Sequence, residues 1–198
     1  MFRVLFNGNK ARHPFFKSKH PVRRAALLLA GVSVLYIVAS AVLGASGAVP
    51  TAPVFFGLDA DNYYFWQMVF ILPLAFAVWV LAAGVLLATG KRGCARSAVL
   101  AEAALAWGVP LLIAWVPSAV QAAFMALGMG QEEWVGILSE PGVWQAVYLG
   151  FFLVAGVWAV GDFIWAARNV HKKSWPAAVL TGVAAFVLAA AAYVAFIR

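Results

Sequence analysis

The sequence predicts an all-α polytopic membrane protein, a bundle of five transmembrane helices preceded by a basic cytoplasmic N-terminal tail. The 198 residues are 65% hydrophobic and 11% charged, whereas a soluble domain is nearer half apolar and a quarter charged. The apolar residues are gathered into runs long enough to cross a bilayer. The charged residues lie mostly between these runs. Such a chain could not cover its own surface with polar groups, so lipid must be its solvent.

Several classes of function are excluded or disfavoured by the residues present. The single cysteine, Cys94, excludes an internal disulfide and a cysteine metal cluster. No HExxH, GxSxG or P-loop pattern occurs. We therefore expect a non-enzymatic protein without a cofactor or metal. A functional site formed by carboxylates within the membrane is kept as an alternative. The net charge of +7 indicates membrane topology and attraction to anionic headgroups, with no nucleic-acid partner.

Residues 1–24 form a basic tail that contains scattered aromatic residues and no acid. The favoured interpretation is a cytoplasmic anchor for the first helix. The overlapping alternative is a segment that rests on the anionic leaflet, where each basic residue contributes about 1 kcal/mol. Lipid headgroup contacts are expected from basic residues of the tail and of the later loops: Arg12, Lys17, Lys19, Arg23, Arg24, Arg96, Arg168, Lys172 and Lys173.

The first two apolar runs are residues 25–49 and 63–88. The region before the first run is too long for the start of a signal peptide, and the run itself is long enough to span, so we expect a retained helix. Asp61 and Asn62 precede the second run. Such residues suit the N-terminal end of a helix, where the helix dipole is positive.

The third run, residues 98–127, is too long for a straight span and contains Pro110 and Pro117. Proline removes a backbone N–H and kinks or breaks a helix. We expect kinks at both prolines, with a second short helix after Pro117 near the outer interface as an alternative. Pro73 is expected to kink the second run. These kinks either serve packing, which is favoured, or expose carbonyls that line a cavity.

The last two runs are residues 143–167 and 175–197. Pro141 precedes the fourth run and Pro176 opens the fifth, each shortly after a serine. A serine cap followed by a proline in the first turn is typical of a helix start. The sequence therefore predicts five crossings.

The loop charges predict the orientation of these crossings. All lysines and arginines except Arg198 lie in the tail or in the loops after the second and fourth runs. The loops after the first and third runs contain acids and no basic residue. The positive-inside rule then places the N-terminus in the cytoplasm and the C-terminus outside. We expect a bacterial cytoplasmic membrane.

Glu102 and Asp162 are carboxylates within apolar runs. A charge at the centre of a membrane helix costs about 2.5–3.5 kcal/mol, so both residues need an explanation. Each lies toward the cytoplasmic end of its run, and the slightly favoured interpretation is a side chain that reaches headgroup depth. The alternative is a polar pathway, open to the cytoplasm, that both carboxylates line.

Tyr63, Tyr64 and Gln67 share one face at the start of the second run, because residues three and four apart are neighbours on a helix. Aromatic residues at this depth usually form an interfacial belt, which is the favoured interpretation. The alternative is that these three side chains face a ligand.

Several soft motifs resemble the small bacterial members of the Yip1 family. They are Tyr63-Tyr64-Phe65-Trp66-Gln67 followed by Pro73 and Ala83-Gly84, the loop from Gly90 to Gly93, and Pro110 followed by Trp115-Val116-Pro117. The resemblance covers residues 10–198 and includes the short basic loop before the last helix. The Asp-Leu-Tyr-Gly-Pro signature of the eukaryotic branch, which is associated with vesicle trafficking and Rab-type GTPases, is absent. The resemblance implies a membrane protein without an assigned activity.

Two functions follow as expectations. The first is a non-enzymatic, Yip1-like protein that binds or organises lipids, with anionic headgroups as partners and self-association through its spans. The second is a small transporter, channel or scramblase in which Glu102 and Asp162 line a cytoplasm-facing polar pathway.

Overall fold

A computed structural model describes residues 20–50, 60–90 and 95–197, and the regular elements in this part of the chain are all helical. Five of the helices are long and apolar enough to cross a membrane, which confirms the all-α class and the five candidate spans. They are α3 (Pro21–Ala45), α4 (Tyr63–Thr89), α5 (Arg96–Ala126), α7 (Val143–His171) and α8 (Trp175–Ile197). A short helix, α6 (Gln131–Ser139), joins α5 to α7, and a 3₁₀ turn (Ala60–Asn62) precedes α4.

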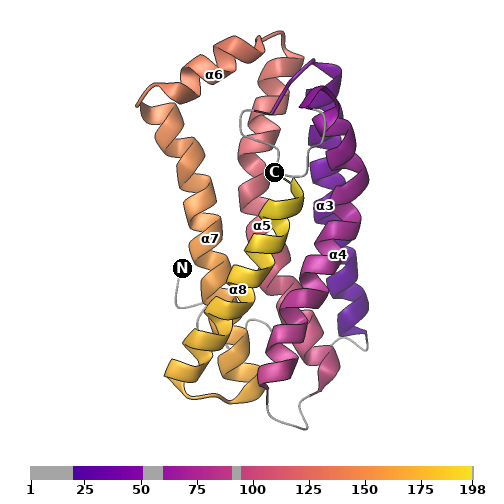
Figure 1. Cartoon of the computed structure of the whole chain (residues 1–198), viewed down its shortest axis with the longest axis vertical. Helices are drawn as coiled ribbons and strands as arrows, with labels where there is room; N and C mark the ends of the chain where they lie inside the picture. The colour runs from indigo at the N-terminus through magenta and orange to yellow at the C-terminus, as the bar shows by residue number, and fades with distance from the viewer. Residues whose placement is uncertain (1–19, 51–59, 91–94, 198) are drawn as a thin grey trace.

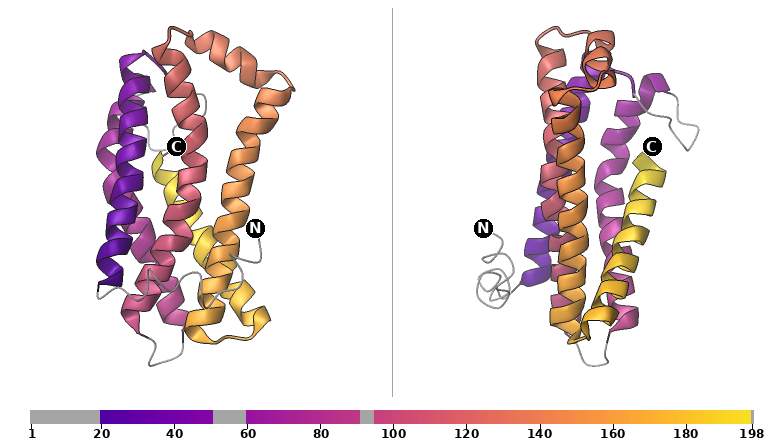
Figure 2. Two further views of the ribbon diagram at one scale, coloured as in Figure 1. Left: turned by 180° about the vertical axis from the view of Figure 1, so that it is seen from behind. Right: turned by 90° about the vertical axis from the view of Figure 1, so that its left-hand side faces the viewer.

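The five long helices form two layers (Figure 1; Figure 2). In one layer, α5 lies between α3 and α7 and packs against both. In the other layer, α4 and α8 lie side by side. α4 also packs on α3 and α5, and α8 also packs on α7. The last helix of the chain therefore returns to cover the second span.

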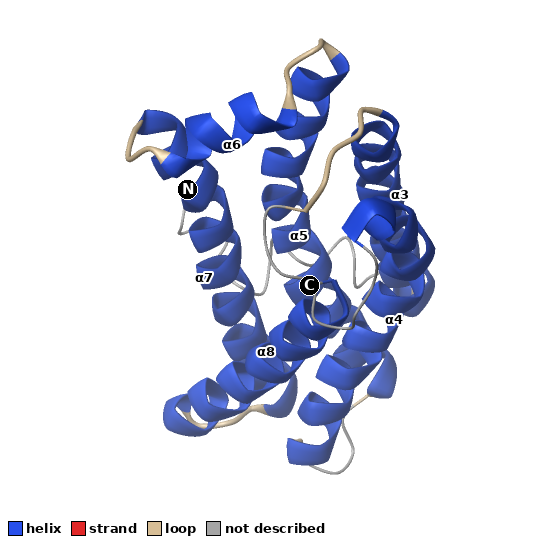
Figure 3. Ribbon diagram, turned by 45° about the horizontal axis from the view of Figure 1, so that its top comes forward, coloured by secondary structure: helices blue, strands red, loops and turns tan. Residues whose placement is uncertain are grey.

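The two ends of the bundle differ in charge. We call them the α6 end, which α6 crosses between the tops of α5 and α7 (Figure 1; Figure 3), and the turn end, which holds the α7–α8 turn at residues 172–174. The described basic residues lie at the turn end, and they are Arg23, Arg24, Arg96, Arg168, Lys172 and Lys173. The described loop acids lie at the α6 end, and they are Asp61, Glu132, Glu133 and Glu140. The alternation of charge along the sequence thus becomes a separation of charge in space.

Three predicted boundaries shift by four residues in the structure, and one of them is the end of the first span, since α3 ends at Ala45 rather than at residue 49. α3 begins at Pro21 rather than at residue 25, because proline suits the first turn of a helix. α7 continues to His171, beyond the predicted end at residue 167. The rest of the predicted tail, residues 1–19, lies outside the described part of the chain, and so do Asp59, Lys91, Arg92, Cys94 and Arg198.

α5 is one continuous helix with Pro110 and Pro117 inside it. The alternative of a second short helix that starts after Pro117 is therefore wrong. The short helix at this end is α6, which follows a turn at Gly128, where φ is 100° and glycine is favoured. Pro73 likewise lies inside α4. Interior prolines are tolerated in membrane helices because neighbouring elements satisfy the released backbone groups, and the kinks at these prolines stay predictions.

Tryptophan side chains tie neighbouring helices together through backbone carbonyls. Trp79 on α4 donates its indole N–H to the carbonyl of Leu100 on α5, over 2.7 Å. Trp115 on α5 donates in the same way to Leu35 on α3, over 2.9 Å. Small residues let membrane helices approach closely, and the Trp79 bond lies next to such residues on α5, the buried alanines Ala101, Ala103, Ala104 and Ala106.

Replacing Trp79 by phenylalanine should therefore weaken the α4–α5 contact. The ring stays apolar but loses its N–H donor, and the expected loss in free energy of unfolding is about 1 kcal/mol. Thermal unfolding of the purified full chain in detergent measures this. Trp144→Phe is the matched control, because Trp144 is 59% exposed. Equal stability of the two variants would argue against the bond.

Candidate functional site

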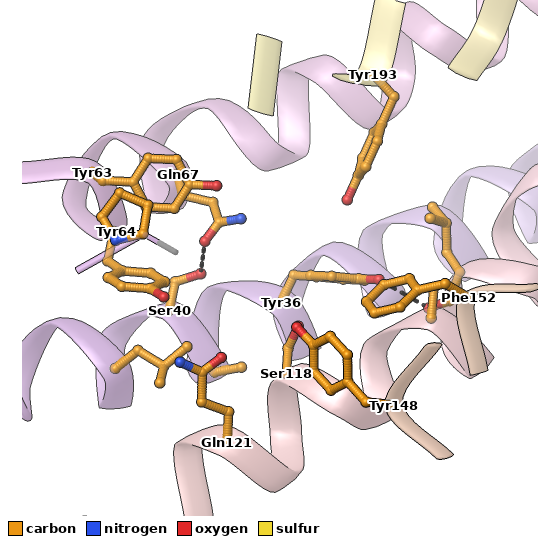
Figure 4. Close-up of a pocket in the computed structure, with 15 residues that line it drawn as sticks. Tyr36, Ser40, Tyr63, Tyr64, Gln67, Ser118, Gln121, Tyr148, Phe152 and Tyr193 are labelled. Carbon is orange, nitrogen blue, oxygen red and sulfur yellow. Dashed lines mark hydrogen bonds between the residues drawn. The ribbon is translucent and has the colours of Figure 1, made fainter. Parts of the chain in front are cut away.

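A cavity of about 190 Å³ lies between the two layers in the half of the bundle nearer the α6 end. Every long helix contributes to its wall (Figure 4). All five tyrosines of the chain line it, so we call it the tyrosine cavity. The described lining residues are Tyr36, Ala39, Ser40, Leu43, Pro50, Tyr63, Tyr64, Gln67, Leu111, Ala114, Ser118, Gln121, Tyr148, Phe152 and Tyr193.

One hydrogen bond orients the amide of Gln67. Ser40, buried on α3, donates its hydroxyl to Gln67 Oε1 over 2.8 Å. A glutamine amide has one acceptor oxygen and two N–H donors. Because Ser40 occupies the oxygen, the amide nitrogen points away from Ser40 toward the cavity (Figure 4). α3 and α4 together therefore present fixed donors at one side of the cavity.

The opposite wall, on α5, presents a second amide. Gln121 is buried, and its Nε2 contacts the sulfur of Met125, one turn along the helix, at 3.9 Å. Its Oε1 is then available as an acceptor on the cavity side (Figure 4). Ser118 lies one turn earlier on the same face and adds a hydroxyl. The cavity thus offers donors from α4 and an acceptor from α5.

The tyrosines come from four helices and surround the same space. Tyr36 donates its hydroxyl to the carbonyl of Leu111 over 3.2 Å, which fixes its ring between α3 and α5. The rings of Tyr63 and Tyr64 meet edge to face at 5.1 Å. Tyr148 and Tyr193 reach the cavity from α7 and α8 (Figure 4). None of the described lining residues is charged, so the chemistry of this cavity is neutral hydrogen bonding against aromatic rings.

A second, smaller cavity of about 60 Å³ lies beneath α6. Apart from the hydroxyl of Tyr148, its described wall consists of hydrocarbon and indole groups. We call it the apolar slot. Its lining residues are Val116, Pro117, Val120, Trp134, Ile137, Leu138, Trp144, Val147, Tyr148 and Phe151.

The two intramembrane carboxylates lie elsewhere. Glu102 is 7% exposed within α5. Asp162 on α7 is half-buried and accepts a hydrogen bond from the indole N–H of Trp158 over 3.0 Å. Neither residue lines the tyrosine cavity or the apolar slot. A pathway lined by both carboxylates stays a prediction.

Two of the expected headgroup contacts are engaged within the protein at the α7–α8 turn. The guanidinium of Arg168 donates to the backbone carbonyl of Lys173 and lies 5.3 Å from the ring centre of Trp175. Lys173 donates its ammonium to the hydroxyl of Thr181 over 2.6 Å, and partial burial lowers the pKa of Lys173. Lys172, by contrast, is exposed and ends α7 in the left-handed conformation, with φ 49°.

The other expected headgroup contacts divide into two groups. Arg23, Arg24 and Arg96 are exposed at the turn end. The expected contacts from Arg12, Lys17 and Lys19 lie outside the described residues.

Sequence reasoning found three of the lining residues, Tyr63, Tyr64 and Gln67, and missed the others. A signal was present for two groups of them. Tyr36 and Ser40 are four residues apart, and Ser118 and Gln121 are three apart, so each pair places polar groups on one face of an apolar helix. Comparisons of the chain with protein-family models, with curated proteins and with solved structures find no match.

Proposed function

We propose that this chain is a non-enzymatic integral membrane protein that binds an uncharged, hydrogen-bonding group, the headgroup of a neutral lipid, in the tyrosine cavity. The observation that carries this proposal is the convergence of all five tyrosines on one cavity. An interfacial aromatic belt would distribute tyrosines around the lipid-facing surface. Tyrosines from four different helices around one space instead suit a binding site of mixed apolar and hydrogen-bonding character.

The polar groups of the cavity favour a ligand that both donates and accepts hydrogen bonds. The amide nitrogen of Gln67 supplies donors and the amide oxygen of Gln121 supplies an acceptor. A charged headgroup would leave water without an ionic partner among the described lining residues, which is costly. Glycerol hydroxyls and ester carbonyls, which are neutral, fit this wall.

The proposal includes an orientation and a family. With the turn end in the cytoplasm, as the positive-inside rule requires, the tyrosine cavity lies in the outer half of the membrane. The exposed basic residues at the turn end then meet anionic headgroups of the inner leaflet. This arrangement accords with a Yip1-like lipid-binding protein, and self-association through the spans belongs to the same proposal. The transporter alternative gains no support from the two cavities, because neither contains Glu102 or Asp162.

Gln67→Leu should weaken the binding of a neutral headgroup. The variant keeps the shape of the side chain but removes the donors that Ser40 orients. Loss of one or two hydrogen bonds at about 1 kcal/mol each corresponds to an affinity about tenfold lower. The measurement is calorimetric titration of the full chain in detergent with 1-monohexanoylglycerol, and with its 3-phosphate as the charged comparison.

The matched control is Gln145→Leu. Gln145 lies on α7 and donates to the carbonyl of Leu138 over 3.0 Å, outside the tyrosine cavity. This control loses a comparable hydrogen bond without touching the site, so it should bind like the wild type. Tighter binding of the phosphate, or equal affinity of wild type and Gln67→Leu, would overturn the proposal.

A further inference from the structure

The tyrosine cavity and the apolar slot share a wall. Tyr148 lines both, with its ring edge to face against Phe152 at 5.3 Å on one side and Trp134 at 6.3 Å on the other. A side chain that lines two cavities at once is the boundary between them.

Consecutive residues on α5 and α7 repeat this division. On α5, Pro117 lines the slot and Ser118 lines the tyrosine cavity. One turn later, Val120 lines the slot and Gln121 lines the tyrosine cavity. On α7, the same change occurs between Phe151 and Phe152. Consecutive residues on a helix are about 1.5 Å apart along the axis, so the two cavities lie on neighbouring faces of α5 and of α7 at the same level of the bundle.

α6 closes the slot at the end of the bundle. Trp134 is buried beneath α6 and packs against Phe124, with ring centres 6.1 Å apart. Glu132 and Glu133 on the same helix are exposed. The start of α6 is fixed to the rest of the bundle, because Gln131 donates to the carbonyl of Val49 over 3.1 Å. The slot is therefore an apolar recess that α6 covers at one end, and two of its lining side chains, Trp144 and Val147, are exposed on the side of α7.

We propose that the ligand is amphipathic, with its neutral headgroup in the tyrosine cavity and its single apolar chain passing Tyr148 into the slot beneath α6. This inference rests on the proposed function and names the class of ligand as a single-chain neutral lipid. Transfer of a chain from lipid to protein gains little from the hydrophobic effect, because both surroundings are apolar. The gain comes from filling a recess whose walls otherwise lack contacts on one side. Val147 and Val120 line that recess from α7 and α5.

The test compares glycerol with 1-monohexanoylglycerol by calorimetric titration of the full chain in detergent. The two probes share hydroxyl groups and differ in the ester and the chain. The wild type should bind 1-monohexanoylglycerol at least tenfold more tightly than glycerol. Val147→Phe fills the slot and should bring the two affinities within about twofold by weakening only the longer probe. Val120→Phe fills it from α5 and should do the same.

Val157→Phe is the matched control, because Val157 is on α7, is 66% exposed and lines neither cavity. It should keep the wild-type preference. Equal wild-type affinity for the two probes, or a preference that both filling variants retain, would overturn the chain path while leaving headgroup binding intact. Binding of neither probe would instead overturn the proposed function, and this inference with it.

Discussion

Gly182→Ala is expected to lower the thermal stability of the chain strongly, although only one methyl group is added. A Cβ atom at Gly182 would overlap the backbone nitrogen and the Cα of Ile164. Backbone atoms cannot rotate away as a side chain can, so α7 and α8 must move apart. Overpacking of this kind costs about 1–3 kcal/mol or more. For a chain of this size, 1 kcal/mol shifts Tm by about 2–4 °C, so the expected fall in Tm is about 2–12 °C.

The matched control is Gly156→Ala on α7. A Cβ atom at Gly156 meets nothing within 4 Å. Alanine also favours the helix over glycine by about 1 kcal/mol, so this variant should be neutral or slightly stabilised. The two substitutions are chemically identical, and only Gly182→Ala should lower the Tm. Thermal unfolding of both variants in one detergent checks this, and a stable Gly182→Ala would contradict the close approach of α7 and α8.

Cysteine labelling should give an all-or-none result for the orientation of the bundle. In a Cys94→Ser background, Glu132→Cys at the α6 end should react with a membrane-impermeant maleimide applied to intact cells. Lys172→Cys at the turn end should not react. Both native residues are exposed, and the positive-inside rule places the turn end in the cytoplasm.

Permeabilised cells provide the control for that experiment. Once the membrane is open, both cysteines should react. This result distinguishes a cysteine that the membrane protects from the reagent from one that is buried within the protein. The reverse pattern in intact cells would place the tyrosine cavity in the cytoplasmic half. That pattern would overturn the proposed position of the cavity in the outer half of the membrane without changing the cavity itself.

Hydropathy and charge were sufficient to predict the five candidate spans and the separation of charge. Each of those features depends on a continuous run of residues, such as 63–88 for α4. The first residue of each helix was harder to predict. For example, α3 begins at Pro21, among basic residues that the sequence assigned to the tail. The continuity of α5 through Pro117 also depends on its neighbours, because α3 and α7 both pack against it.

The cavity could be predicted only in part, because its members come from five helices. The free-energy cost of a charged side chain inside a membrane helix drew attention to Glu102 and Asp162. These two residues line neither described cavity. Tyr193 carries no local signal, since it is a single aromatic residue within an apolar helix. Only the packing of α8 against α4 brings Tyr193 opposite the α4 residues of the cavity. The sequence also does not identify Gly182 as a position of close contact, because no spacing distinguishes it from the other glycines. Its importance depends on the position of Ile164 in the folded chain.

The pairing of α4 with α8 has a consequence for biogenesis. α3, α4 and α5 contact one another directly, so the first three spans can associate while the ribosome is still adding residues. At that stage the tyrosine cavity has no Tyr148 and no Tyr193. Both arrive with the α7–α8 hairpin, which follows these three spans in the chain and is therefore synthesised after them. A ligand that needs all five helices can therefore bind only after α7 and α8 have joined the first three spans, so its occupancy would distinguish a complete bundle from a partly assembled one.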